Sequence, residues 1–166
     1  MKISKQFWFY FTVIAFPLFF VLHGLNEQFG LIRNTIIAEL LLYYILLAVM
    51  IAGASAFLFK EYERATVFVF FILCIYFFFG AAKDSLKETF AGQFLVRYSI
   101  AIPIVLLLIS VSFSILKRTK SSLTRAALFI RTLLVICLII ETGFLFYNRK
   151  FKKIFQFFKK SKFYKK

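Results

Sequence analysis

Apolar residues fill five long stretches of the chain, and polar residues gather between them. The stretches run over 7–22, 36–59, 65–82, 98–116 and 126–147. A helix needs roughly 20 mostly apolar residues to cross about 30 Å of hydrocarbon at 1.5 Å per residue. We therefore expect an all-α polytopic membrane bundle of about five transmembrane helices over residues 1–148. The short connections favour antiparallel packing of successive helices.

The last segment, 149–166, forms a basic tail with a helical pattern of its own. Phe151, Ile154, Phe155 and Phe158 recur at helical spacing, which predicts a basic amphipathic C-terminal helix on the bilayer surface. Six cations that flank or separate these apolar residues are expected to contact lipid head groups: Arg149, Lys150, Lys152, Lys153, Lys159 and Lys160. A solvated, frayed end and a partner-binding helix are the alternatives.

Composition supports the membrane class and locates most of the charge. The chain is 62% hydrophobic with a mean hydropathy of +0.86, which lies beyond the range of a soluble domain. It carries 22 Lys and Arg against 7 Asp and Glu, and nine of the cations fall in 149–166. These cations lie between and after apolar runs. We therefore expect the lipid bilayer and its anionic head groups as partners, and no nucleic acid.

The cations of the short loops predict an orientation. With the N-terminus inside, the inner segments hold eight Lys and Arg residues and the outer loops hold four. The positive-inside rule then favours a cytoplasmic N-terminus. Five crossings place the basic tail outside, which conflicts with the same rule unless a long translocated region follows the tail.

Two acidic residues, Glu39 and Glu141, fall inside apolar stretches, where an ionised group is costly. Both are placed toward the outer end of their helices. The outer loops and helix ends add six further polar residues: His23, Asn26, Glu27, Lys83, Asp84 and Arg97. The pattern predicts a polar cluster facing an ion or a substrate, with Glu39 or Glu141 paired to Lys83 or Arg97. Ordinary loop residues plus two carboxylates at interface depth are the alternative interpretation.

No motif typical of a catalytic or cofactor site occurs in the sequence. The patterns GxxxxGK[ST], GxSxG, HExxH and GxGxxG are absent. His23 is the only histidine, and Cys74 and Cys137 stand alone inside apolar runs. A His-based metal cluster or a His/Cys nucleophile pair therefore cannot be assembled within one chain. We expect no catalytic residue, no cofactor and no metal site.

Four segments carry a family resemblance. They are FPLFFVLHGLNEQFGLI from Phe16, FFFGAAKDSLKE from Phe77, LVRYSIAIPIVLLL from Leu95 and ILKRTKSSLTRAALF from Ile115. Together they resemble the membrane region of bacterial membrane-anchored sulfatase-like hydrolases of the alkaline phosphatase superfamily. In such proteins several helices precede an extracytoplasmic α/β catalytic domain, whose hallmarks this chain lacks. The resemblance implies a bacterial inner (cytoplasmic) membrane, a cytoplasmic N-terminus and an extracytoplasmic C-terminus.

These observations favour a non-catalytic integral membrane protein that anchors or positions an extracytoplasmic or membrane protein partner. The chain is then a standalone or truncated relative of the membrane region, or its catalytic part is supplied separately. A small transporter or channel with a Glu39/Glu141 ion site is one alternative. An accessory subunit of a larger membrane complex, with the basic tail as docking element, is another.

Overall fold

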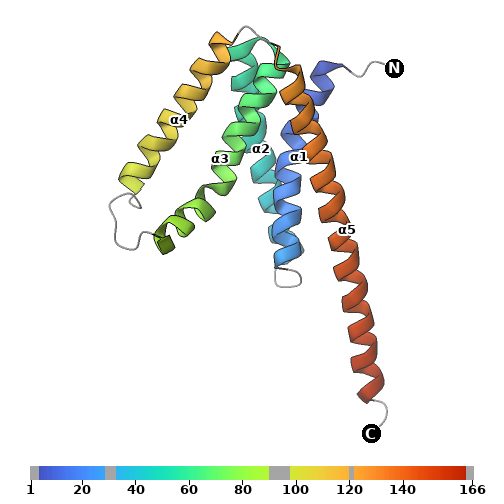
Figure 1. Cartoon of the computed structure of the whole chain (residues 1–166). Helices are drawn as coiled ribbons and strands as arrows, with labels where there is room; N and C mark the ends of the chain where they lie inside the picture. The colour runs from blue at the N-terminus through green and yellow to red at the C-terminus, as the bar shows by residue number, and fades with distance from the viewer. Residues whose placement is uncertain (1–3, 29–32, 90–97, 120–121, 164–166) are drawn as a thin grey trace.

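Five helices make up the described part of the chain in the computed structural model (Figure 1). The structure describes residues 4–28, 33–89, 98–119 and 122–163. Within these ranges, the side chains of 34, 89, 149 and 151–163 are left out. The helices are α1 (Lys5–Glu27), α2 (Asn34–Phe59), α3 (Tyr62–Thr89), α4 (Tyr98–Arg118) and α5 (Thr124–Phe163). Each contains a segment long and apolar enough to cross a membrane. The predicted all-α bundle of five spanning helices is confirmed, and the described residues contain no strand.

The helices extend beyond the apolar stretches at their polar ends. α1 continues from the predicted end at 22 to Glu27, and α3 continues from 82 to Thr89. Hydropathy marks only the part of a helix that lies in hydrocarbon, whereas backbone hydrogen bonding continues into the interface. His23, Asn26, Lys83 and Asp84 therefore project from helices.

Helices α1 and α3 form the centre of the bundle. α1 packs against α2, α3 and α5, and α3 packs against all four other helices. α4 packs closely only against α3, and Figure 1 shows it set apart from α1 and α5. Most of the surface of α4 is consequently left to lipid.

An aromatic cluster around Phe77 of α3 joins three helices. Its ring centroid lies 4.3 Å from that of Phe20 and 5.6 Å from that of Phe16, both on α1. Tyr44 of α2 meets the same ring edge-on at 4.9 Å. Aromatic pairs in such geometries contribute about 0.5–1.5 kcal/mol beyond the area they bury. The cluster therefore fixes α1, α2 and α3 against one another.

The turn between α2 and α3 is made by a residue in left-handed conformation. Lys60 has φ 55°, and its backbone N–H donates to the carbonyl of Ala56 at 3.1 Å. This is the αL cap that usually employs glycine, because other residues are strained there. The cap ends α2 and lets α3 begin at Tyr62.

Helix α5 is unbroken for 40 residues, from Thr124 to Phe163. The spanning segment ends at Asn148, and the helix continues through most of the tail. The predicted C-terminal helix is thus present as a continuation of the fifth span, with no break from it. Its location on the bilayer surface stays a prediction.

Candidate functional site

The C-terminal end of α1 is bonded to α5 through one carboxylate. Nδ1 of His23 lies 2.8 Å from Oε1 of Glu141. Nδ2 of Asn26 donates to Oε2 of Glu141 at 2.6 Å and to its main-chain carbonyl at 2.8 Å. His23 and Asn26 are three residues apart, so they share one face of α1. We name His23, Asn26, Glu27 and Glu141 the His23–Glu141 cluster.

Burial makes these contacts stronger than surface contacts. Glu141 is only 9% exposed, although it carries an acidic group inside a spanning segment. A carboxylate in this position needs partners, and the short distances are typical of charge-assisted hydrogen bonds. Asn26 Oδ1 is buried without a hydrogen-bond partner among the described residues. The Asn26 amide is thus oriented by Glu141 alone.

Glu27 extends the cluster toward the solvent. Its Oε1 lies 3.4 Å from Nε2 of His23, and both side chains are substantially exposed. Nδ1 of His23 must carry a proton to donate to Glu141, whereas Nε2 can accept or donate according to the tautomer and charge. The imidazole therefore lies between two carboxylates, one buried and one exposed. A proton on Nε2 would give it an ion pair with each of them.

Glu39 lies apart from this cluster. It is exposed on α2 and makes no hydrogen bond or ion pair with another described residue. α2 and α5 are also not a closely packed pair. The structure therefore does not join Glu39 to Glu141.

Lys83 and Asp84 belong to a second polar group, at the end of α3. Nζ of Lys83 lies over the ring of Tyr98, 2.9 Å from its centroid. Asp84 accepts from Nζ of Lys87 at 3.4 Å. The predicted pairing of Lys83 with Glu39 or Glu141 is therefore wrong, because sequence places a residue along its helix but not toward a particular neighbour. Arg97 lies outside the described residues.

The tail cations are described only in part. Lys150 is exposed. The other residues predicted to contact lipid head groups lie on the α5 backbone without described side chains: Arg149, Lys152, Lys153, Lys159 and Lys160. Their contact with head groups stays a prediction.

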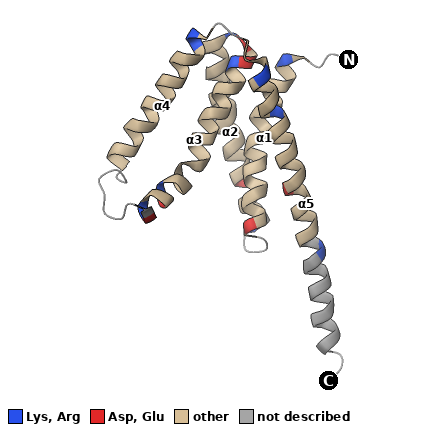
Figure 2. Ribbon diagram, in the orientation of Figure 1, with Lys and Arg blue, Asp and Glu red and all other residues tan. Residues whose placement is uncertain are grey.

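A polar cluster at the opposite end of the bundle was not predicted. Glu63 of α3 is largely buried. Its Oε1 lies 3.0 Å from Nζ of Lys5 on α1, and its Oε2 accepts a hydrogen bond from Oγ1 of Thr124 on α5 at 2.8 Å. Figure 2 shows charged residues at both ends of the helices and few between them. In the sequence Glu63 lies in a short charged run from Lys60 to Arg64, which is typical of a solvated loop. Only the packing of α1, α3 and α5 distinguishes Glu63 from a solvated loop residue.

Arg131 lies within α5, near the Glu63 cluster of Lys5, Glu63 and Thr124. Its guanidinium is 5.7 Å from the ring of Trp8, within the range of a cation–π contact. Its Nε and Nη2 atoms are buried without a hydrogen-bond partner among the described residues. The side chain is therefore held against α1.

The described residues contain no group of three or more His, Cys, Asp or Glu side chains that could hold a metal ion. What the His23–Glu141 cluster can do chemically is bind or release a proton and join two helices. It offers a general base and a general acid. Cys74 lies in the span of α3, and Cys137 lies in the span of α5 four residues before Glu141. The cluster therefore has the properties of a structural or proton-linked contact.

The five spanning helices and the polar clusters at their ends define a multi-pass membrane protein. Comparison with known proteins takes the assignment no further, because no family model, no curated protein and no solved structure matches the chain. The resemblance to the membrane region of sulfatase-like hydrolases accordingly stays a prediction.

Proposed function

We propose that this chain is a non-catalytic membrane anchor that positions a protein partner outside the cytoplasm of a bacterium. The observation that carries the proposal is the continuity of α5. This helix packs against α1 and α3 within the bundle and then runs without a break from Asn148 to Phe163. At 1.5 Å per residue, the continuation extends roughly 22 Å beyond the span.

Two polar clusters support a mechanical role for α5. The Glu63 cluster holds its first residue, Thr124, and the His23–Glu141 cluster holds it seven residues before the span ends. Fixing a helix at two distant points restrains both its tilt and its rotation. A partner bound to the continuation would therefore be held at a defined position relative to the bundle.

The experiment places a photocrosslinking amino acid at Lys150, which is exposed on α5, in cells that make the full chain. A matched control carries it at Lys60, which is exposed at the other end of the bundle. We expect one protein adduct from position 150 and none of that mass from position 60. Insertion of Gly-Pro after Asn148 should abolish the adduct while leaving the thermal stability of the bundle unchanged. Turnover of phosphate or sulfate esters by the purified chain alone would contradict the proposal.

A second candidate, a small transporter or channel, is favoured by the buried carboxylate of Glu141 beside His23. A proton or cation pathway through this point would need both residues. Proteoliposome flux that disappears in Glu141→Gln and persists in Glu39→Gln would support this candidate over the anchor. Equal flux in empty liposomes and in liposomes containing the chain would eliminate it.

A further inference from the structure

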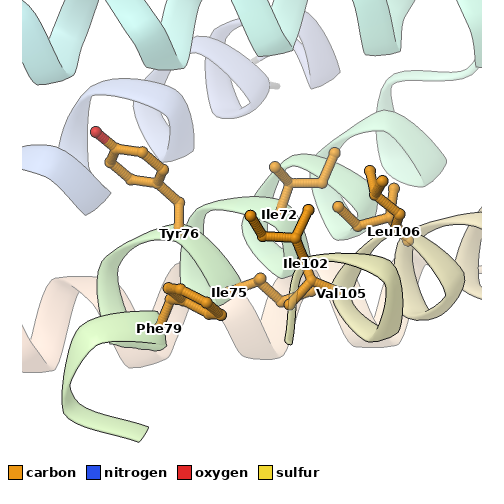
Figure 3. A pocket seen from close by; sticks show the side chains of 8 residues that line it. Ile72, Ile75, Tyr76, Phe79, Ile102, Val105 and Leu106 are labelled. Carbon is orange, nitrogen blue, oxygen red and sulfur yellow. The ribbon is translucent and has the colours of Figure 1, made fainter. Parts of the chain in front are cut away.

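An apolar groove runs between α3 and α4, and it is independent of the anchoring role proposed above. Its volume is about 310 Å³. Eight side chains line it, four from each helix: Ile72, Ile75, Tyr76, Phe79, Ile102, Val105, Leu106 and Ile109. In Figure 3 the aliphatic side chains of the two helices face one another, and the hydroxyl of Tyr76 points away from them.

Both walls of the groove are single helical faces. The four residues of α3 and the four of α4 each follow the spacing i, i+3, i+4, i+7. The groove is therefore parallel to the spanning segments rather than across them. Its walls remain open to the membrane, since Ile102 and Leu106 are half exposed or more. A long, thin apolar molecule fits this shape.

The same two faces end in polar groups. One turn beyond Phe79 on α3 stands Lys83, and one turn before Ile102 on α4 stands Tyr98. The rings of Phe79 and Tyr98 are 6.5 Å apart, and Nζ of Lys83 lies over the Tyr98 ring. The apolar groove thus leads directly to an ammonium and a phenol at its end.

Lys83 carries a charge that no described carboxylate neutralises. The neighbouring Asp84 is within 3.4 Å of Lys87, whereas Lys83 forms no ion pair with any described residue. A cation without a counter-ion at the membrane interface attracts the phosphate of an anionic lipid. An apolar channel and a cation at its end match the two parts of such a lipid.

We propose that the α3/α4 groove binds one acyl chain of an anionic phospholipid, whose phosphate is held by Lys83 and Tyr98. Because α4 packs closely only against α3, a space remains beside these two helices, and the lipid fills it. It also joins two helices whose direct contact is limited. The bound lipid would be a structural part of the protein.

Native mass spectrometry of the detergent-purified full chain tests this proposal. The probes are phosphatidylglycerol and phosphatidylcholine with identical acyl chains, so that only the head-group charge differs. We expect one phosphatidylglycerol per chain, bound about fivefold more tightly than phosphatidylcholine, which is the increment of one interfacial lysine. Equal binding of the two lipids would overturn the proposal.

Two pairs of variants separate the head-group contact from the groove. Lys83→Gln should remove the preference for phosphatidylglycerol, whereas Lys87→Gln, which loses an ion-paired lysine of the same helix, should keep it. Val105→Trp should fill the groove and weaken both lipids about tenfold, whereas Ile104→Trp, on the outward face of α4, should not. If Val105→Trp prevents folding, Lys83→Gln still decides the result. A preference that survives Lys83→Gln, or a chain dimer that excludes lipid from the groove, would contradict the proposal.

Discussion

Nδ1 of His23 and Oε1 of Glu141 lie 2.8 Å apart although 118 residues separate them in the sequence. The contact joins the end of the first helix to the last one. It puts a histidine and a buried carboxylate together in a chain that has one histidine and seven acidic residues. Its contribution to stability is open to direct measurement.

Replacing Glu141 by alanine should destabilise the bundle by roughly 1–2 kcal/mol. The change removes the acceptor of His23 and Asn26 in a site with little solvent, and hydrogen bonds between membrane helices contribute up to about 1.7 kcal/mol. Unfolding by sodium dodecyl sulfate in mixed micelles measures the difference. Glu39→Ala, on the exposed face of α2, is the control and should change stability by less than about 0.5 kcal/mol. Equal effects of both variants would show that the His23–Glu141 cluster contributes nothing specific.

Replacing Glu63 by glutamine should cost about 1 kcal/mol, because Glu63 accepts from both Lys5 and Thr124 in a largely buried site. The matched control is Glu61→Gln. Glu61 is exposed, immediately precedes α3 and pairs with Arg64 three residues later, a kind of contact that contributes a few tenths of a kcal/mol. The same unfolding assay compares the two. If Glu61→Gln is the more damaging variant, the bridging role of Glu63 is wrong.

Lys60→Gly should stabilise the turn between α2 and α3 by up to about 1 kcal/mol. Lys60 is the one described non-glycine residue with positive φ, and glycine relieves the strain of this conformation. Lys60→Val should destabilise, because a β-branched residue is the least compatible with left-handed backbone. Thermal unfolding in detergent ranks the stabilities of the unchanged chain, Lys60→Gly and Lys60→Val. Valine at least as stable as lysine would refute the role of the cap.

Leu73→Ala should cost roughly 2 kcal/mol, because Leu73 is 0% exposed and its removal leaves a cavity between packed helices. Leu42→Ala should cost little. Leu42 is 64% exposed, and its side chain contacts lipid in the folded and the dissociated bundle alike. The two variants remove the same atoms, so their difference measures packing without the hydrophobic transfer term. Similar losses of stability would mean that the assigned core is incorrect.

Cysteines at positions 60 and 87 should react with membrane-impermeant maleimide from opposite sides of the membrane, with position 60 on the cytoplasmic side. The loops that contain more cations are expected inside. Cys74 and Cys137 lie within spans and are first replaced by alanine. Labelling of position 60 in intact cells would reverse the predicted orientation.

The number and approximate position of the helices could be read from the sequence because the length of an apolar stretch is set by membrane thickness. The rotation of each helix about its own axis could not be read from the sequence. α2 is apolar on all sides, so its pattern gives no sign of which face is buried or that Glu39 is exposed. The sequence placed His23 and Glu141 near one end, as observed, but their contact depends on the rotation of α1 against α5. The Glu63 cluster escaped prediction for the same reason.

The contact between the first and the last helix can form only late in the synthesis of the chain. The ribosome adds about 5–20 residues per second, so 118 residues take roughly 6–24 s. During that interval His23 and Asn26 lie at the end of α1 before their acceptor Glu141 exists. Helices α1, α2 and α3 can already assemble around Phe77, which keeps α1 in place until α5 is inserted. The bundle therefore gains this link between its first and last helices only when the fifth helix is completed.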